Sequence, residues 1–226
     1  MESGFFIIVI LIVVALIAFG YWRKEQRKKE LMAWASAHSL NFDPGRRSGM
    51  DSEFLEFGVL RQGSNRYGYN FLEGNWKDYV FTGFDYHYET YSTDSKGRRQ
   101  THHHHFSAVT LRSKMSLKQL VIRPEGIFDK LKDFFGYNDI DFESAEFSKK
   151  FHVSAKDKRW AYDVLHARAI EFLMQQTRYH IQFDQHHIIV YQGGRVFSPE
   201  SFADAANVVV GLLEMLPEYV IQQQAG

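Results

Sequence analysis

The sequence contains no cysteine. This absence excludes disulfide bonds and thiolate zinc sites, and it agrees with a reducing compartment. Charge of one sign is not in excess either. Lysine and arginine together number 27, aspartate and glutamate together also number 27, and the formal net charge is +0. Without an overall positive field the chain does not attract nucleic acid, so nucleic acid is not among its expected partners.

The patterns of several enzyme classes are also missing. The phosphate loop GxxxxGK followed by Ser or Thr does not occur, nor does the dinucleotide fingerprint GxGxxG. Ser107, Ser113 and Ser116 lack the glycines of a nucleophile elbow. The acidic residues from Asp139 to Glu146 do not match EF-hand offsets and predict an exposed acidic stretch. These absences favour a non-enzymatic protein, leave catalytic activity open, and assign no catalytic residue and no cofactor.

The first positive signal is an apolar run over residues 4–22, which holds no charged side chain. As a helix, this run would extend about 28 Å, close to the bilayer hydrocarbon thickness of about 30 Å. We therefore expect a single membrane-spanning helix that contacts the lipid bilayer through residues 4–22. The opening Met1-Glu2-Ser3 lacks the cations of a signal peptide and favours retention, although Ala18-Phe19-Gly20 loosely matches a cleavage site.

Cations follow the apolar run at once, at Arg23, Lys24, Arg27, Lys28 and Lys29. The positive-inside rule places that end in the cytoplasm, with the N-terminus outside. The localisation expected from this pattern is a cell inner membrane, crossed once, with a cytoplasmic C-terminal domain. We expect the cations to face lipid headgroups; a polybasic lipid sensor is an alternative interpretation of the same residues.

The helical pattern continues past the cations, since Leu31, Trp34, Ala35 and His38 recur at helical spacing. Turn-forming residues over 41–49 then predict a linker. This gives three parts: an anchor over 1–22, a basic juxtamembrane helix and linker over 23–50, and a cytoplasmic α+β domain over 51–226.

Within that domain, strand patterns precede helix patterns. Alternation predicts strands over 57–61, 67–72, 79–91, 101–111, 180–183 and 187–191. Helical spacing predicts helices over 127–135, over 157–176 with a cap at Ser154, and over 199–216 with a cap at Ser198. Strands first and helices later indicate the α+β class, here an antiparallel-sheet meander with later packing helices.

Four consecutive histidines occupy positions 102–105. If the hairpin before them is symmetric about Lys96, His87 lies opposite His105 and Glu89 lies opposite His103. Because strand side chains alternate, one face then holds the candidate metal ligands His87, Glu89, His103 and His105, suited to zinc or nickel. The ordinary interpretation is a solvated hairpin end that binds no metal.

Several motifs resemble a family of uncharacterised bacterial membrane-anchored proteins. They are AHSLNF, FDYHYETY, VIRPEG, DIDF with EFSKKFHV, and SPESF, spread over nearly the whole chain. The resemblance implies a bacterial inner-membrane protein with a cytoplasmic α+β domain. It carries over no catalytic residue, and the four-histidine run is particular to this chain.

Three functional hypotheses follow. The leading one is a non-enzymatic scaffold or protein-binding domain at the cytoplasmic face, with a membrane or cytoplasmic protein as partner and exposed tyrosines at its interface. The candidate tyrosines are Tyr69, Tyr86, Tyr88 and Tyr91. The second is a metal-binding protein or metal-dependent enzyme that uses the histidine and glutamate cluster with zinc. The third is lipid or lipoprotein handling at the bilayer.

Overall fold

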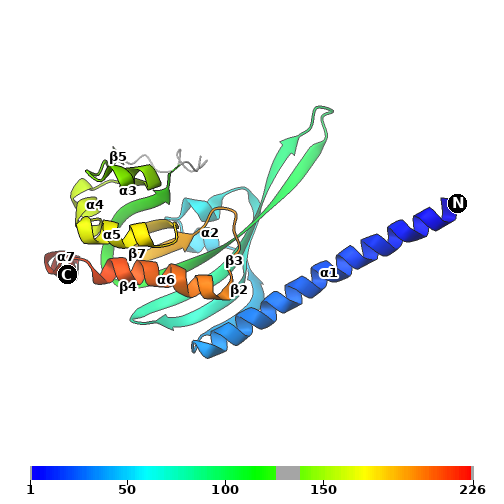
Figure 1. Cartoon of the computed structure of the whole chain (residues 1–226), viewed down its shortest axis with the longest axis horizontal. Coiled ribbons are helices and arrows are strands. Elements are labelled where there is room, and N and C mark those ends of the chain that lie inside the picture. The colour runs from blue at the N-terminus through cyan, green and yellow to red at the C-terminus, as the bar shows by residue number, and fades with distance from the viewer. Residues whose placement is uncertain (1, 126–137, 225–226) are drawn as a thin grey trace.

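The computed structural model describes residues 2–125 and 138–224 and shows one long helix that projects from a body of strands and shorter helices (Figure 1). This helix, α1, runs over Glu2–Ala37. Its stretch from Phe6 onward is long and apolar enough to cross a membrane, and its most apolar part is not buried by the rest of the chain. The expected continuation of the apolar helix beyond the cations is confirmed.

One antiparallel sheet of seven strands forms the centre of the body. The strands are β1 (Asn41–Arg47), β2 (Ser64–Trp76), β3 (Tyr79–Thr93), β4 (Arg99–Pro124), β5 (Asn138–Asp139), β6 (Phe151–Ala155) and β7 (His180–Tyr191). Their order is β1-β2-β3-β4-β6-β5, and β7 also pairs with β4. The long strand β4 therefore has β3 and β6 along one edge and β7 along the other.

Short helices cover both faces of the sheet. They are α2 (Met50–Glu53), the 3-10 helix η1 (Gly58–Arg61), α3 (Ala145–Lys150), α4 (Lys158–Val164), α5 (Ala167–Gln175), α6 (Pro199–Glu214) and α7 (Glu218–Gln224). The larger apolar core joins one sheet face to the end of α1, α4, α5 and α6. A smaller core lies on the opposite face beneath α2 and η1. The α+β class and the antiparallel sheet are confirmed.

The β3–β4 hairpin has the register that the sequence predicts. His87 pairs with His105, and Glu89 pairs with His103. The hairpin extends beyond the rest of the sheet (Figure 1). At its tip, Gly97 has a φ of 77°, and the Asp94 carboxylate accepts hydrogen bonds from the backbone N–H groups of Lys96 and Arg98. This compact turn fixes the symmetry about Lys96 on which the register depends.

The predicted linker over 41–49 is wrong, because most of it forms the edge strand β1, paired with β2. Pro44 and Gly45 do break the pairing, but as a bulge between Asp43 and Arg46 within the strand. Arg47 then ties β1 to β2 through both carboxylate oxygens of Glu73.

The predicted single helix over 157–176 is two helices, α4 and α5, separated at Leu165 and His166. Its cap is Asp157 and not Ser154, since the Asp157 carboxylate accepts from the N–H groups of Arg159 and Trp160. Ser154 belongs instead to β6, a strand that the sequence did not predict.

Three further differences concern short elements. Residues 58–61 form η1, where the sequence predicted a strand. The two strands expected at 180–183 and 187–191 are one strand, β7, with Gln185 at a φ of 49° where the pairing with β4 shifts. The strand expected at 101–111 is part of the longer strand β4. The helix expected over 127–135 lies outside the described residues, whereas α6 and its Ser198 cap are confirmed.

Candidate functional site

A polar strip runs along one face of β2, β3 and β4, beginning where α1 contacts the sheet and continuing outward along the β3–β4 hairpin. Alternation brings Asp85, His87 and Glu89 of β3 to this face, and their partners across β4 are Ser107, His105 and His103. Across β2, Asp85 pairs with Tyr69 and His87 pairs with Tyr67. The opposite face of the same strands carries apolar residues of the smaller core, among them Phe84, Tyr86 and Phe106.

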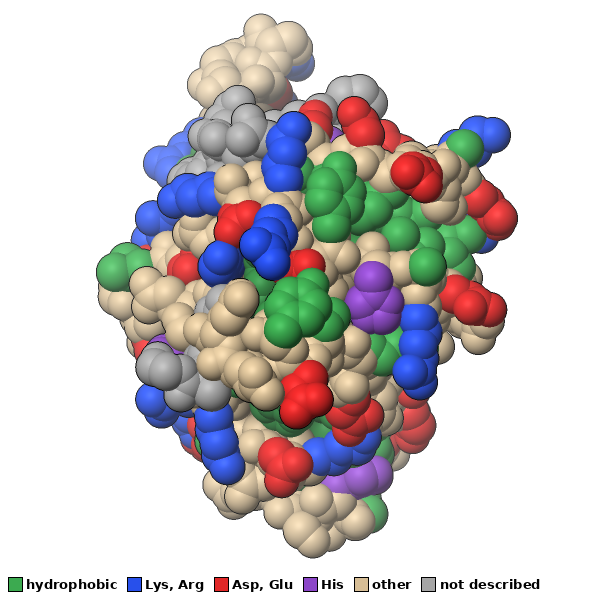
Figure 2. Space-filling model, turned by 90° about the vertical axis from the view of Figure 1, so that its left-hand side faces the viewer, with side chains coloured by type: hydrophobic (Ala, Val, Ile, Leu, Met, Phe, Trp, Pro, Cys, Tyr) green, Lys and Arg blue, Asp and Glu red, His purple; other side chains and the backbone are tan. Residues whose placement is uncertain are grey.

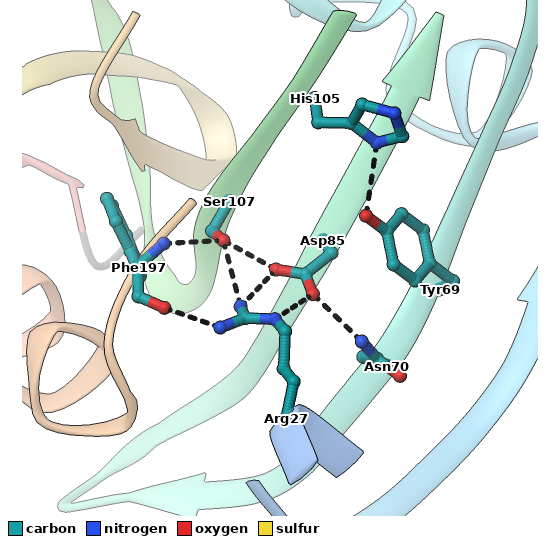
Figure 3. A network of polar contacts seen from close by, with 7 residues as sticks. All are labelled: Arg27, Tyr69, Asn70, Asp85, His105, Ser107 and Phe197. Carbon is teal, nitrogen blue, oxygen red and sulfur yellow. Dashed lines mark hydrogen bonds and ion pairs between the residues drawn. The ribbon is translucent and has the colours of Figure 1, made fainter. Parts of the chain in front are cut away.

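The inner end of the strip is an ion pair between α1 and the sheet (Figure 3). Arg27 Nη2 lies 2.6 Å from Asp85 Oδ1, and Arg27 Nε lies 2.8 Å from Asp85 Oδ2. Asp85 is fully buried, and it also accepts hydrogen bonds from Ser107 Oγ at 2.5 Å and Asn70 Nδ2 at 2.9 Å. Four hydrogen bonds, two of them from Arg27, therefore converge on one buried carboxylate.

The same arginine reaches a third element. Arg27 Nη1 donates to the carbonyl oxygen of Phe197 at 2.8 Å, and the N–H of Phe197 donates to Ser107 Oγ at 2.9 Å. Phe197 directly precedes the cap of α6. Arg27 therefore joins α1, β3 and the start of α6, and the expectation that it faces lipid headgroups is wrong. Of the other cations, Arg23, Lys24 and Lys29 are exposed, and Lys28 pairs with Glu25.

The outer end of the strip holds three of the four candidate metal ligands. One ligand atom each from His87, Glu89 and His103 lies within 4.8 Å of the other two. His87 Nε2 is 3.2 Å from His103 Nδ1, and that atom is 3.4 Å from Glu89 Oε1. His87 is buried, whereas the His103 side chain is 58% exposed. The cluster is therefore open to solvent on one side.

His105, the fourth candidate, lies beside this cluster and outside it. Its Nδ1 contacts the hydroxyl of Tyr69 at 3.2 Å (Figure 3), and its ring centroid is 4.8 Å from that of His87. Burial lowers the pKa of His105, and the neighbouring imidazoles of His87 and His103 lower it further. His105 thus lies along β4 between the partner of Glu89 and the partner of Asp85.

Asn65 is a supporting residue that sequence reasoning missed. It lies in a bulge of β2 with a φ of 48°. Its backbone carbonyl oxygen is 3.1 Å from His87 Nδ1, and its side-chain amide N–H donates to Glu89 Oε1 at 2.6 Å. That hydrogen bond, followed by one from Tyr91, keeps the pKa of Glu89 below its usual value. The only sequence signal was an asparagine beside a glycine turn, which predicts a turn but no site.

A groove of about 890 Å³ opens elsewhere, between α3, α4 and α5. Apolar side chains line it, namely Phe142, Tyr162, Leu165, Ile170 and Met174. Acidic side chains stand at its rim, namely Asp141, Glu143, Glu146 and Glu171, of which Glu146 pairs with Lys150. Figure 2 shows this side of the molecule, where green apolar side chains gather in the upper half and red acidic ones stand around them. The exposed acidic stretch expected from Asp139 onward forms part of this rim.

The candidate tyrosines have different environments. Tyr86 is fully buried and donates a hydrogen bond to the carbonyl oxygen of Leu60 at 2.6 Å, so its assignment to an exposed interface is wrong. Tyr69 and Tyr88 are partly buried, and Tyr91 is 44% exposed. The remaining two histidines of the run, His102 and His104, bond to Ser92 and Thr90 on the opposite face of the hairpin.

The described residues form an antiparallel sheet packed by helices, of the α+β class. A solved structure that shares this fold is the crystal structure of the mycobacterial trehalose monomycolate transport factor A, TtfA. It is 12% identical in sequence, with a TM-score of 0.59, and the match covers 84% of this chain and 96% of that one. No family model and no curated protein matches the sequence, so the resemblance to an uncharacterised bacterial family stays a prediction.

Proposed function

We propose that this protein is a non-enzymatic, single-pass membrane protein whose α+β domain binds a protein partner at the cytoplasmic face of a bacterial inner membrane. The observation that carries the proposal is the continuity of α1 from its apolar run into the core. Leu31 and Trp34 of α1 are buried in the core that contains α6, and Arg27 adds the ion pair to Asp85. Because one helix serves both parts, the domain would hold a set orientation to the bilayer.

Exposure of the apolar run supports the membrane anchor. Large apolar side chains from Phe6 to Trp22 are mostly more than 40% exposed, and a soluble protein rarely leaves so long an apolar surface in water. The exposed cations Arg23, Lys24 and Lys29 follow the run directly. By the positive-inside rule they favour a cytoplasmic domain and an outside N-terminus.

The groove between α3, α4 and α5 is the surface best suited to a partner. Its apolar lining would receive apolar side chains, and its acidic rim favours a segment that carries Lys or Arg around them. We therefore infer that the partner contributes a basic amphipathic segment, in the manner of a helix laid in a groove. The fold shared with a transport factor supports an accessory role of this kind, without indicating what is transported.

Site-specific photo-crosslinking in intact cells tests the proposal. A photoreactive residue at Ile170 in the groove should give one discrete crosslinked protein in the membrane fraction. The charge reversal E143K/E171K should reduce that crosslink at least tenfold. The control reversal E53K, at an exposed acid on α2, should leave it unchanged. Purified full-length protein in nanodiscs should also bind a synthetic peptide of the captured segment, and the groove reversal should weaken that binding.

Two results would contradict the proposal. One is a crosslink that is equally strong with E143K/E171K and with E53K, since the groove would then not be the contact. The other concerns topology. Protease added to spheroplasts should leave the domain intact, so digestion of the domain before lysis would contradict the proposal by placing the domain on the outer side of the membrane.

A further inference from the structure

We propose that His87, Glu89 and His103 form a binding site for one divalent transition-metal ion, best suited to zinc, at the base of the β3–β4 hairpin extension. The site is independent of the partner surface, because it lies on a different part of the sheet from α3, α4 and α5. The spacing of the ligand atoms, the groups that orient them and the open side of the cluster support the site.

The spacing matches a tetrahedral ion. Zinc binds histidine nitrogen and carboxylate oxygen at about 2.0–2.2 Å, so two ligands of a tetrahedral zinc lie about 3.4 Å apart. The distance from His87 Nε2 to His103 Nδ1 is 3.2 Å, and that from His103 Nδ1 to Glu89 Oε1 is 3.4 Å. Two of the three ligand edges therefore already have the required length. The third edge, between Glu89 and His87, is at most 4.8 Å.

Protonation favours an ion over a set of hydrogen bonds. The Asn65 carbonyl can only accept, so His87 carries its proton on Nδ1 and presents the lone pair of Nε2 to the cluster. A single proton on His103 Nδ1 can bridge to His87 or to Glu89, but not to both. A divalent cation at the point where the three atoms converge satisfies all of them at once.

Asn65 supplies the outer support that metal ligands ordinarily have. Its backbone carbonyl fixes the tautomer and ring orientation of His87, and its side-chain amide donates a hydrogen bond to Glu89 Oε1. Tyr91 holds the other carboxylate oxygen at 3.0 Å. Such second partners orient the ligands, and their loss typically weakens metal affinity by about 10–100-fold. Asn65 is therefore a positioning residue for two of the three ligands.

The fourth coordination position faces solvent, on the side where His103 is exposed. Two histidines and one carboxylate with an open position are typical of zinc sites that keep a bound water. His105 is not among the residues whose ligand atoms lie within 4.8 Å of one another, and its Nδ1 contacts the Tyr69 hydroxyl. The two histidines on the opposite face, His102 and His104, cannot reach the ion, which makes them a matched control within the same run.

Metal titration of the full-length, untagged protein in detergent, purified without a metal column and stripped with chelator, tests the site. Zinc should bind at one equivalent by calorimetry, and cobalt should give the visible absorption of a tetrahedral ion. H103Q should weaken zinc binding at least tenfold, and N65G, which keeps the left-handed backbone, should weaken it about tenfold. The zinc affinity of H102Q/H104Q should stay within about twofold of that of the unaltered protein. E89Q should lose the cobalt bands.

The proposal fails if the unaltered protein binds less than one equivalent of zinc at millimolar concentration. It also fails if H102Q/H104Q loses as much affinity as H103Q, because the binding would then come from a histidine-rich surface. Circular dichroism of each variant establishes that the fold is kept. Since no groove residue is altered, either result leaves the crosslinking experiment to be judged by itself.

Discussion

Arg27 of α1 and Asp85 of β3 share a two-point ion pair, with Nη2 2.6 Å from Oδ1 and Nε 2.8 Å from Oδ2. Asp85 is fully buried, and the Arg27 side chain is only 23% exposed. Arginine suits this position because its planar fork matches both carboxylate oxygens, which a lysine cannot do. The pair therefore attaches the domain directly to the helix that carries the apolar run.

Removing one member of this pair should be costly. R27Q leaves a buried charge without its main partner, and we expect the free energy of unfolding to fall by about 3–5 kcal/mol. R27Q/D85N should lose less than R27Q alone, because it removes the buried charge together with its partner. K28Q, which affects only the pair with Glu25, should show no measurable change. Chemical unfolding in detergent measures all three, and equal stability of R27Q and K28Q would refute the role.

The buried hydroxyl of Tyr86 should contribute to the stability of the fold. It is buried and donates to the carbonyl of Leu60, so Y86F leaves a buried acceptor unpaired and should cost about 1–2 kcal/mol. Y91F removes a surface hydroxyl that contacts Glu89 and Ser64, and should stay within about 0.5 kcal/mol. Thermal unfolding of both variants checks the comparison; a larger loss for Y91F would contradict it.

Stability should also depend on the protonation of His180. Burial, with the nearby Arg123 cation, lowers the pKa of His180 to about 4 in the folded protein, against about 6.5 when unfolded. Between these values the unfolded chain binds more protons, so the contribution of His180 is full above about pH 6.5 and is lost as the pH falls toward about 4.

The expected contribution to the loss between pH 7 and pH 5 is about 2 kcal/mol. H180F removes the titrating group and keeps a ring against Tyr191, whose centroid lies 4.7 Å from that of His180. The variant should therefore lose about 2 kcal/mol less than the unaltered protein over this interval. Denaturant unfolding at the two pH values measures the difference, and parallel losses would show that His180 does not control it.

The cap of α4 gives a smaller and more local effect. Asp157 accepts two backbone N–H bonds and also pairs with Lys118 at 2.7 Å; the hydrogen bond from Lys118 is the main cause of its lowered pKa. D157A should destabilise the protein by about 1 kcal/mol, whereas D157N keeps a capping side chain and should lose less. Thermal unfolding would distinguish the two, and equal losses would mean that the charge, not the cap, matters.

Local rules predicted the hairpin well. The compact turn around Lys96 and the strict alternation of strands were sufficient to pair His87 with His105 and Glu89 with His103. They were not sufficient to separate His105 from the other three candidate ligands, because its orientation depends on Tyr69 of a third strand. The role of Asn65 was out of reach for the same reason, since it depends on a bulge that only tertiary pairing creates.

Other errors came from local signals that tertiary structure overrides. Pro44 and Gly45 are turn residues, and they do interrupt the pairing, but β2 accommodates them as a bulge in an edge strand. From the sequence, Arg27 was predicted to be one of several equivalent cations after the apolar run. Nothing in its immediate neighbours indicates a carboxylate 58 residues away, because sequence patterns report periodicity and not distant partners.

The packing of α1 against α6 also sets an order of events during synthesis. The Trp34 ring lies 6.3 Å from that of Phe202, so the first helix of the chain meets α6 only when almost the whole sequence has been made. Trp76 of β2 can pack on Trp34 earlier, but the part of the core that α6 covers stays open, and one edge of β4 awaits β7. Contacts between such distant segments form late and slowly. The nascent protein therefore spends most of its translation with an open core, beside a helix whose apolar half is already complete.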